Sequence, residues 1–293
     1  MNSSLFKKYQ LKHLCAIIGC SPSEVEYITE HINDYYAEWF EKKIDKTTGG
    51  FKTFKDGTLK KRTIRPSLKR LKVIQSSIKN KILAPISLPD NIHGGVTGRS
   101  NITNAKPHQG KKYKFTTDIK DFYPSIKSDK VYSSLLVVGL SDHFAHWLTK
   151  LTTWKYELPQ GTPTSTHIAN IAFLETDNKL ISFCNLHNLT YTRYIDDLTF
   201  SSQQDFEPIL NDILQIIKKD FKINHRKTSY STNNSIVTGI EVFNNFIDAP
   251  EKIKVKAAEE ELLKSDSKPY SIYKARIRNS NKNTIKGRKS ISR

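Results

Sequence analysis

Hydrophobic residues recur along this chain at two different spacings, which separate helical from extended stretches. Apolar positions three or four residues apart predict helices over residues 1–40, 67–83, 130–154, 166–183, 206–217 and 251–263. Short runs rich in β-branched and aromatic residues predict strands at 115–119, 190–194, 198–200 and 236–242. A basic hairpin is expected over residues 51–66, turning at Asp56-Gly57. Polar residues that interrupt the predicted strands are therefore exceptions that need a physical reason.

Three aspartates interrupt two of the predicted extended stretches. Asp196 and Asp197 join the apolar runs of Thr190–Ser202, although Asp is also a common turn residue, so an acidic hairpin tip is an alternative interpretation. Asp118 lies inside the strand that ends before Pro124, where Asp is disfavoured. Adjacent like charges among apolar residues are costly unless a cation neutralises them. The cluster therefore predicts a site for two Mg²⁺ ions about 3.5–4 Å apart, because oxygen ligands suit this ion.

Three segments resemble motifs of reverse transcriptases, in the order and spacing of a polymerase palm. Lys114–Ile126 (KFTTDIKDFYPSI) resembles the first catalytic motif, Leu158–Gly161 (LPQG) the nucleotide-binding turn, and Tyr194–Asp197 (YIDD) the metal-binding hairpin. Ile195 departs from the commoner Ala, and Thr166 departs from the Pro that the family often has. Neither departure changes a residue that would bind a metal ion.

Two further segments resemble signatures of retron reverse transcriptases. Asn104–His108 (NAKPH) matches the N-A-x-x-H motif, and Val237–Gly239 (VTG) matches the V-T-G motif. The resemblance as a whole reaches from about residue 36 to about residue 263. It implies an α/β fold of the right-hand polymerase type, with an antiparallel palm sheet and helices. N-terminal helices and fingers would occupy residues 1–83, the palm with part of the fingers 84–245, and the thumb with a basic tail 246–293.

The resemblance also implies an activity and partners. The chain would be the RNA-directed DNA polymerase of a retron, which copies a structured non-coding RNA into a branched RNA–DNA molecule (msDNA) within an anti-phage defence system. Expected partners are that RNA and its DNA copy, deoxynucleoside triphosphates and a retron effector protein, without a membrane. The alternatives are another stand-alone bacterial or group II intron-like reverse transcriptase, or an RNA-binding scaffold that no longer polymerises. The intact carboxylates, LPQG turn and basic hairpin argue against the scaffold, and the chain has no room for the maturase extension of the intron type.

Residue roles that the resemblance implies fall into three groups. The catalytic and metal-binding residues would be Asp118, Asp196 and Asp197. The nucleotide-binding residues would be Arg62, Lys55, Tyr123, Gln160, Gly161 and Lys227. The RNA-binding residues would be Asn104, His108, Val237, Thr238, Gly239, Lys268, Tyr270, Tyr273, Lys274, Arg276 and Arg278.

Three of these roles compete with an ordinary structural interpretation. Tyr123 is either a core aromatic or, as in reverse transcriptases, the bulky residue under the incoming sugar that excludes a ribose 2′-OH. Lys227 is either a surface lysine or a general acid that protonates the leaving pyrophosphate. The hairpin that carries Arg62 is either a solvated basic surface or a finger that closes on a triphosphate, whose geometry a guanidinium matches. For His108 the sequence gives no physical role.

Basic charge is concentrated in two segments of the chain. The formal net charge is +18 over 293 residues, which favours a polyanionic partner. Residues 41–83 contain 14 Lys/Arg against 3 Asp/Glu, and residues 264–293 contain 10 against 1, so the remainder is close to neutral. Aromatic residues among the C-terminal basic residues suit RNA, although such a tail is also typical of disorder without a partner.

Other sequence features limit the class of protein further. The three cysteines form no CxxC pair, which predicts a reducing cytoplasm and no disulfide framework. No apolar run approaches the ~20 residues needed to cross a bilayer, and the N-terminus lacks a signal-peptide pattern. The Gly-rich segment Asp90–Ser100 lacks the form G-x-x-x-x-G-K-[ST], which disfavours a P-loop nucleotidase.

Overall fold

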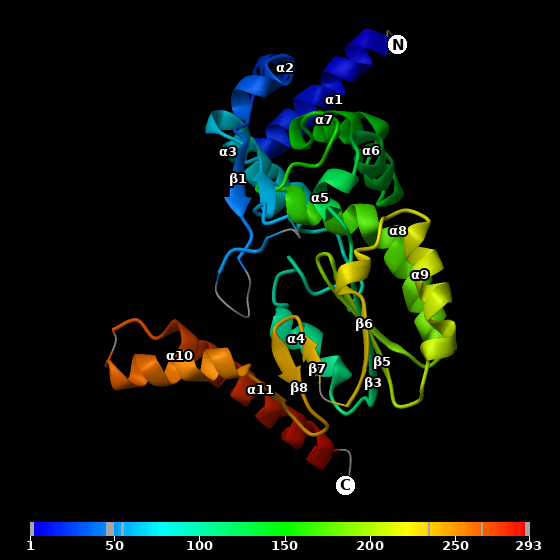
Figure 1. Cartoon of the computed structure of the whole chain (residues 1–293). Coiled ribbons are helices and arrows are strands. Elements are labelled where there is room, and N and C mark those ends of the chain that lie inside the picture. Colours follow the sequence, from blue (N-terminus) through cyan, green and yellow to red (C-terminus); the bar gives the residue numbers. More distant parts are fainter. Residues whose placement is uncertain (1–2, 45–49, 54–55, 234, 265, 291–293) are drawn as a thin grey trace. The chain divides into compact units, whose positions relative to one another are not determined.

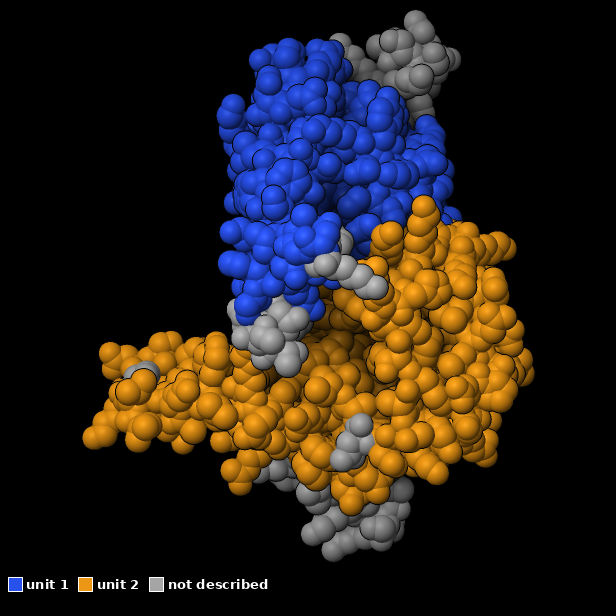
Figure 2. Space-filling view, viewed as in Figure 1, with its two compact units in different colours: residues 1–88, 121–174 blue, residues 89–120, 175–293 orange. Residues whose placement is uncertain are grey.

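The computed structural model describes residues 3–44, 50–53, 56–233, 235–264 and 266–290, with side chains for all of these except residues 3–10 and 282–290. The chain divides into two compact units (Figure 2). Unit 1 comprises residues 1–88 and 121–174, and unit 2 comprises residues 89–120 and 175–293. The predicted boundaries of fingers, palm and thumb at residues 83 and 245 describe a different division, and they stay a prediction. Within the described residues, no helix is both long enough and apolar enough to cross a membrane.

Unit 1 is mainly a packing of helices around α7 (Asp142–Thr152). Helix α7 contacts α1 (Ser3–Ile18), α2 (Pro22–Glu30), α3 (Lys69–Ile78) and α6 (Ser128–Val137). Apolar residues at helical spacing, such as Leu71, Ile74 and Ile78 of α3, are fully buried in this core. The remaining helical elements are η1 (Ile32–Tyr35), the π-helical turn η2 (Lys79–Leu83), α5 (Phe122–Ser125) and the first half of α8 (Ser165–Leu186).

The prediction of helix over residues 1–40 is confirmed for α1, α2 and the short turn η1, but it is wrong beyond Tyr35. Residues Trp39–Lys42 form strand β1, which pairs antiparallel with β2 (Lys61–Ile64). The predicted turn at Asp56-Gly57 is present, since Thr53 bridges Leu59 across it. The basic strand β2 nevertheless pairs with β1, where Trp39 and Phe40 are strand-favouring residues. Their partners in β2 lie more than 20 residues further along the chain, so the local pattern did not predict this pairing.

Unit 2 contains a four-stranded antiparallel sheet in the order β4-β5-β3-β6. These strands are β3 (Tyr113–Asp118), β4 (Thr190–Tyr194), β5 (Asp197–Ser202) and β6 (Ser229–Thr232). Phe115, Phe200 and Tyr191 stack across neighbouring strands, with ring centroids 4.8 to 5.9 Å apart. The elements η4 (Glu207–Ile209) and α9 (Leu210–Lys218) follow β5, and α9 runs beside the second half of α8 (Figure 1). A short helical turn, η5 (His225–Lys227), then leads into β6.

A second sheet in unit 2 joins the two motifs of retron type. It contains β7 (Ser235–Val237), β8 (Ile240–Val242) and β9 (Ile247–Asp248), and it packs with α4 (Asn101–Ala105), α10 (Glu251–Leu262) and α11 (Pro269–Ser290) (Figure 1). The turn η3 (Lys106–His108) follows α4 and contacts β4 and β5 of the first sheet. The predicted single strand over residues 236–242 is wrong. Thr238 and Gly239 have φ angles of 46° and 79° and form the turn between β7 and β8, because two-residue hairpin turns favour positive φ. Within the basic C-terminal segment, residues Pro269–Ser290 form the helix α11.

Candidate active site

The structure brings the three predicted carboxylates together at one end of the β3–β5 ladder. Asp118 is the last residue of β3 and pairs directly with Asp197, the first residue of β5, so their side chains leave the same face of the sheet. Asp196 lies in the turn between β4 and β5, where Ile195 has a φ of 61°. The backbone N–H of Ile119 donates to the carbonyl of Asp196 at 3.0 Å and fixes that turn against β3. One oxygen from each carboxylate lies within 4.8 Å of the others.

Burial and mutual repulsion both act on this cluster. Burial raises the pKa of Asp196, and the charge of Asp118 raises it further. Burial, then the charges of Asp196 and Asp118, raise the pKa of Asp197 to about 7. Full ionisation therefore costs free energy unless a cation neutralises the group. Three oxygen donors without a sulfur or imidazole ligand fit a hard divalent ion such as Mg²⁺.

Two residues that follow α9 bind Asp118 directly. Lys227 Nζ lies 2.6 Å from Asp118 Oδ2. Asn224 donates its side-chain Nδ2 to Asp118 Oδ1 at 3.0 Å and its backbone N–H to the Asp118 carbonyl at 2.8 Å. Burial alone would lower the pKa of Lys227, but its hydrogen bond to Asp118 and the nearby carboxylate charges outweigh this and raise it. Lys227 thus belongs to the carboxylate site, and so does Asn224, which was not among the predicted site residues.

A fully buried ion pair supports the hairpin that carries Asp196. Arg193 of β4 contacts Asp177 of α8 through two nitrogens, at 2.6 Å from Nη2 to Oδ2 and 2.9 Å from Nε to Oδ1. Nη1 of the same guanidinium donates to the carbonyl of Ile195 at 2.8 Å. Tyr191 adds a hydrogen bond to Asp177 at 2.7 Å. A charged residue inside an apolar strand was the signal that could have identified Arg193, as it identified Asp118.

Gly94 packs against the same turn. A Cβ atom at Gly94 would lie 2.5 Å from both the backbone nitrogen and Cγ1 of Ile195, a separation that no side chain tolerates without a shift of the turn. Gly94, in the Gly-rich segment Asp90–Ser100, therefore allows the backbone to pack closely against the β4–β5 turn. This packing, and not phosphate binding, accounts for a glycine at this position.

The predicted nucleotide-binding residues of the N-terminal half belong to unit 1. Arg62 of β2 pairs with Glu41 of β1 at 2.7 Å, and both side chains are exposed. Lys55 lies outside the described residues. Tyr123 in α5 is half-buried, and its hydroxyl lies 3.1 Å from that of Thr166. These positions leave the nucleotide-binding role of each a prediction.

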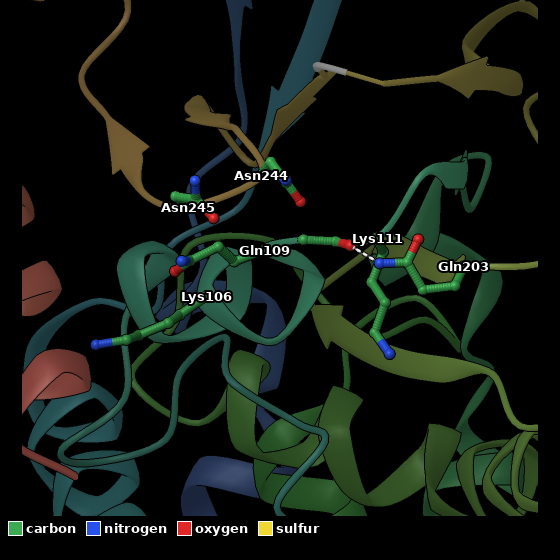
Figure 3. A pocket seen from close by; sticks show the side chains of 7 residues that line it. Lys106, Gln109, Lys111, Gln203, Asn244 and Asn245 are labelled. Carbon is green, nitrogen blue, oxygen red and sulfur yellow. Dashed lines mark hydrogen bonds between the residues drawn. The ribbon is translucent and has the colours of Figure 1, made fainter. Parts of the chain in front are cut away.

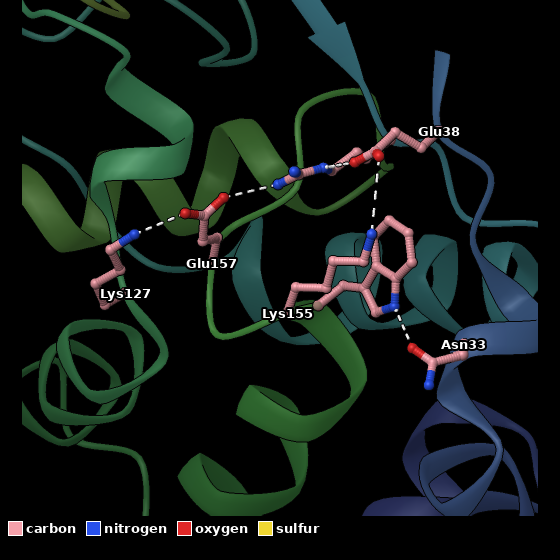
Figure 4. Close-up of polar contacts among 7 residues, drawn as sticks. Asn33, Glu38, Lys127, Lys155 and Glu157 are labelled. Carbon is pink, nitrogen blue, oxygen red and sulfur yellow. Dashed lines mark hydrogen bonds and ion pairs between the residues drawn. The ribbon is translucent and has the colours of Figure 1, made fainter.

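An ion-pair network that the sequence did not predict holds the LPQG turn. Arg65 contacts Glu38 at 2.5 Å and Glu157 at 2.7 Å, while Lys127 contacts Glu157 at 2.7 Å (Figure 4). The backbone N–H of Arg65 donates to the carbonyl of Gln160 at 2.7 Å. Gly161 has a φ of 109°, and a Cβ there would lie 3.1 Å from Ile64. The network therefore joins β2 to the turn that carries Gln160 and Gly161.

The predicted RNA-binding residues divide into buried and exposed groups. Asn104 and His108 are fully buried: Asn104 Nδ2 donates to the Thr238 hydroxyl at 3.2 Å, and the ring of His108 bridges the hydroxyls of Thr192 and Ser201 at 2.8 and 2.7 Å. Val237 lies in the core cluster that also contains Ile277 of α11. The N-A-x-x-H and V-T-G motifs therefore contact each other, and their buried side chains would act on RNA only through the surface that they support.

The half-buried and exposed members of this group lie on α11, beside it or in the β7–β8 turn. Tyr273 accepts a hydrogen bond from Asn101 Nδ2 at 2.6 Å, and Tyr270 pairs with Lys256 at 3.0 Å. The basic residues are half-buried or exposed, namely Lys268, Lys274, Arg276 and Arg278. In the turn of the β7–β8 hairpin, Gly239 is exposed and Thr238 is half-buried.

Sequence comparison decides the family. The model of the reverse transcriptase (RNA-dependent DNA polymerase) family matches residues 52–261. The chain belongs to this family. Its curated relatives include the retron Se72 reverse transcriptase of Salmonella heidelberg (strain 579083-10), 33% identical over 169 residues that cover 57% of this chain and 45% of the relative. The retron Ec86 reverse transcriptase of Escherichia coli is 34% identical over 142 residues, covering 48% of this chain and 44% of the relative.

These matches confirm the predicted resemblance to retron reverse transcriptases and the right-hand polymerase fold class. The aligned segments span less than half the length of the two curated relatives. Among solved structures, apo telomerase from Candida Tropicalis truncated from its C-terminal domain is similar at a TM-score of 0.43 and 13% identity, covering 77% of this chain and 59% of that chain.

Proposed function

We propose that the chain is the RNA-directed DNA polymerase of a retron, which extends a primer hydroxyl with deoxynucleotides on an RNA template. The observation that carries the proposal is the convergence of Asp118, Asp196 and Asp197 in a chain of the reverse transcriptase family. Asp118 and Asp196 would each hold a divalent cation, with Asp197 completing the site. Two Mg²⁺ ions bound there would supply an activated hydroxyl nucleophile and charge stabilisation for the leaving pyrophosphate.

Further residues of the chain would orient the reactants. The ammonium group of Lys227 contacts Asp118 Oδ2. After this contact breaks, Lys227 would donate a proton to the leaving pyrophosphate. Gln160 and Gly161 would contact the incoming nucleotide, Arg62 its triphosphate, and Tyr123 its sugar. Their shared support is the network that ties Arg65 to the Gln160 carbonyl.

The partner that we propose is a structured non-coding RNA, copied into a branched RNA–DNA molecule in an anti-phage system with an effector protein. Support comes from the retron names of the curated relatives and from the basic segments of the chain. An A-form major groove is too narrow for side chains to read, so recognition would rest on shape and unpaired bases.

The test is primer extension on an RNA template with and without Mg²⁺. Asp196→Asn should reduce the rate by about 10²-fold or more, because a preorganised charge at the reacting phosphate is lost. Asp212→Asn on the exposed face of α9 makes the same chemical change away from the site and should extend primer at the wild-type rate. Unchanged extension by folded Asp196→Asn would show that the carboxylate cluster is not the polymerase site.

A further inference from the structure

A polar pocket of about 390 Å³ lies in unit 2, away from the carboxylates (Figure 3). Three segments of the chain line it: η3 with the residues that follow it, the residue after β5, and the β8–β9 turn. The lining residues are Lys106, Gln109, Gly110, Lys111, Gln203, Asn244 and Asn245. Gln203 directly follows Ser202, which pairs with Tyr113 at the end of the ladder opposite Asp118 and Asp197. At a rise of about 3.4 Å per residue, the six-residue ladder separates its two ends by roughly 17 Å.

Hydrogen bonds to Gly110 and Lys106 hold the walls of this pocket in place. The Gly110 N–H donates to the Phe243 carbonyl at 3.2 Å, and the Gln203 side chain donates to the Gly110 carbonyl. Gly110 has a φ of 75°, and a Cβ there would meet the Asn244 carbonyl at 3.2 Å. Lys106 Nζ donates to the carbonyl of Ser280 in α11. The pocket is therefore formed by backbone that the fold fixes.

The lining defines the chemistry of a ligand. It contains two lysines and four side-chain amides but no acidic residue and no aromatic or aliphatic side chain. Among the described residues, none forms a hydrogen bond with the side-chain amides of Gln109, Asn244 or Asn245, and no carboxylate pairs with Lys111. This composition disfavours a metal ion or an apolar ligand, and it suits an anion that carries hydrogen-bonding groups. The volume lies within the range of about 300–1,000 Å³ that is usual for small-molecule sites, which is more than a lone phosphate needs.

We propose that this pocket binds one unpaired nucleotide of single-stranded RNA, with Lys111 on the phosphate and the amides of Gln109 and Asn245 on the base edge. Asn and Gln amides offer a donor and an acceptor side by side, the pattern that base edges match. Bases of single strands are free to leave the stack and enter a pocket, whereas paired bases are not. The proposal rests on the proposed function for the presence of an RNA partner, and it adds an anchoring site remote from the polymerase centre.

The test measures binding of a fluorescent, unstructured 12-nucleotide RNA of mixed sequence to the full chain, without Mg²⁺ or nucleotides. Lys111→Gln should weaken binding about four-fold at 0.15 M salt and reduce the log–log salt slope by about 0.7, the share of one phosphate contact on a single strand. Its matched control is Lys112→Gln, the adjacent exposed lysine outside the pocket, which should change neither value.

The double variant Gln109→Ala/Asn245→Ala should weaken binding at least about five-fold and leave the slope unchanged, because base contacts release no counterions. The same variant should bind a 12-base-pair RNA duplex as the wild type does. A 4-thiouridine version of the single strand should cross-link to residues 106–111, 203 or 244–245.

Equal behaviour of Lys111→Gln and Lys112→Gln, or wild-type binding by the amide variant, would overturn the pocket as an RNA site. So would an equal loss of duplex binding or cross-links confined to other segments. Failure of the polymerase proposal looks different, since it would appear as a lack of primer extension while these binding differences persist.

Discussion

At the scale of single residues, we expect the uncharged Asn224 to set the affinity of the carboxylate site for cations. Its amide and its backbone N–H both bind Asp118, so the side chain holds one carboxylate oxygen in a fixed direction. Asn224→Ala should raise the Mg²⁺ concentration for half-maximal primer extension about ten-fold, because partners that orient a metal ligand typically contribute 10–100-fold to affinity. The rate at saturating Mg²⁺ should stay close to that of the wild type.

The control for Asn224 is the next residue along the chain. His225 is exposed and forms no side-chain hydrogen bond to Asp118 among the described residues, so His225→Ala should leave the Mg²⁺ requirement unchanged. An equal Mg²⁺ requirement for Asn224→Ala and wild type would remove Asn224 from the site and leave it as a residue of the β3–η5 connection.

His108, the buried histidine of the N-A-x-x-H motif, contributes to the stability of the four-stranded sheet through its bonds to Thr192 and Ser201. Burial, then the charge of Lys114, lowers the pKa of His108 to about 3, whereas an unfolded chain would show about 6.5. The unfolded state alone therefore gains this proton as pH falls from about 6.5 towards 3. The stability that the neutral ring provides is complete above pH 6.5 and is lost as pH falls through that window, by up to about 1.4 kcal/mol per pH unit.

His108→Gln should therefore flatten the loss of unfolding free energy between pH 6.5 and 4, as measured by urea denaturation across that range. The variant is expected to be less stable at pH 7, because Gln cannot reproduce both hydrogen bonds to Thr192 and Ser201. The exposed His187→Gln serves as the matched control and should retain the wild-type pH dependence. Parallel curves for wild type and His108→Gln would contradict the neutral, buried assignment.

At the scale of elements, the β4–β5 hairpin depends on the ion pair beneath it. Asp177 and Arg193 are both fully buried, and loss of one partner leaves a buried charge without compensation. Asp177→Asn should lower the free energy of unfolding by about 3–5 kcal/mol. Glu41→Gln, which breaks the exposed pair with Arg62, should cost less than about 1 kcal/mol. Chemical denaturation compares the two, and similar small losses would mean that solvent reaches Arg193.

Elements with strong local signals were predictable from the sequence, and those whose partners lie far along the chain were not. The helices predicted at residues 206–217 and 251–263 and the YIDD hairpin follow their own periodicity and turn residues, whereas no such signal predicted α11. The segment Trp39–Lys42 reads locally as the end of a helix, and only its pairing with Lys61–Ile64 makes it a strand. Thr238 was placed inside a strand because β-branched residues favour strands, whereas the turn sets it at a φ of 46°.

The same limit applies to the candidate site. Charged residues inside apolar strands are conspicuous in a sequence, which is why Asp118, Asp196 and Asp197 could be found. Asn224 and Gly94 have no such signal, since their contacts with Asp118 and Ile195 arise only when distant segments fold together. The roles implied for His108 and Asn104 did not include burial, because a motif match carries no information on exposure.

At the scale of the whole molecule, the C-terminal basic segment serves both packing and charge. Ile277 of α11 is fully buried against Val237 and Ile240, while Arg276 and Arg278 beside it are exposed. Removal of the segment from Lys268 onward would therefore expose a core cluster in addition to removing charge. Substitution of the exposed charges separates these two effects.

The triple variant Lys274→Gln/Arg276→Gln/Arg278→Gln should bind RNA more weakly and reduce the log–log salt slope by up to about 2, the counterion share of three single-strand phosphate contacts. The control Lys218→Gln/Lys219→Gln/Lys222→Gln removes the same charge from exposed positions at and after the end of α9. Fluorescence anisotropy over a range of salt concentrations gives both slopes. Equal slopes for the two triple variants would mean that net charge alone, and not α11, attracts RNA.

The direct pairing of Asp118 with Asp197 also limits how this chain can be recombined with its relatives. Side chains alternate along a strand, so one residue gained or lost between Tyr113 and Asp118 would shift the pairing and turn one carboxylate to the opposite face. A chimera is therefore safe only when its crossover points fall outside residues 113–118 and 190–202, or when both segments come from one parent. Gene shuffling must therefore preserve the length of these strands as well as the carboxylates and Arg193 that they carry.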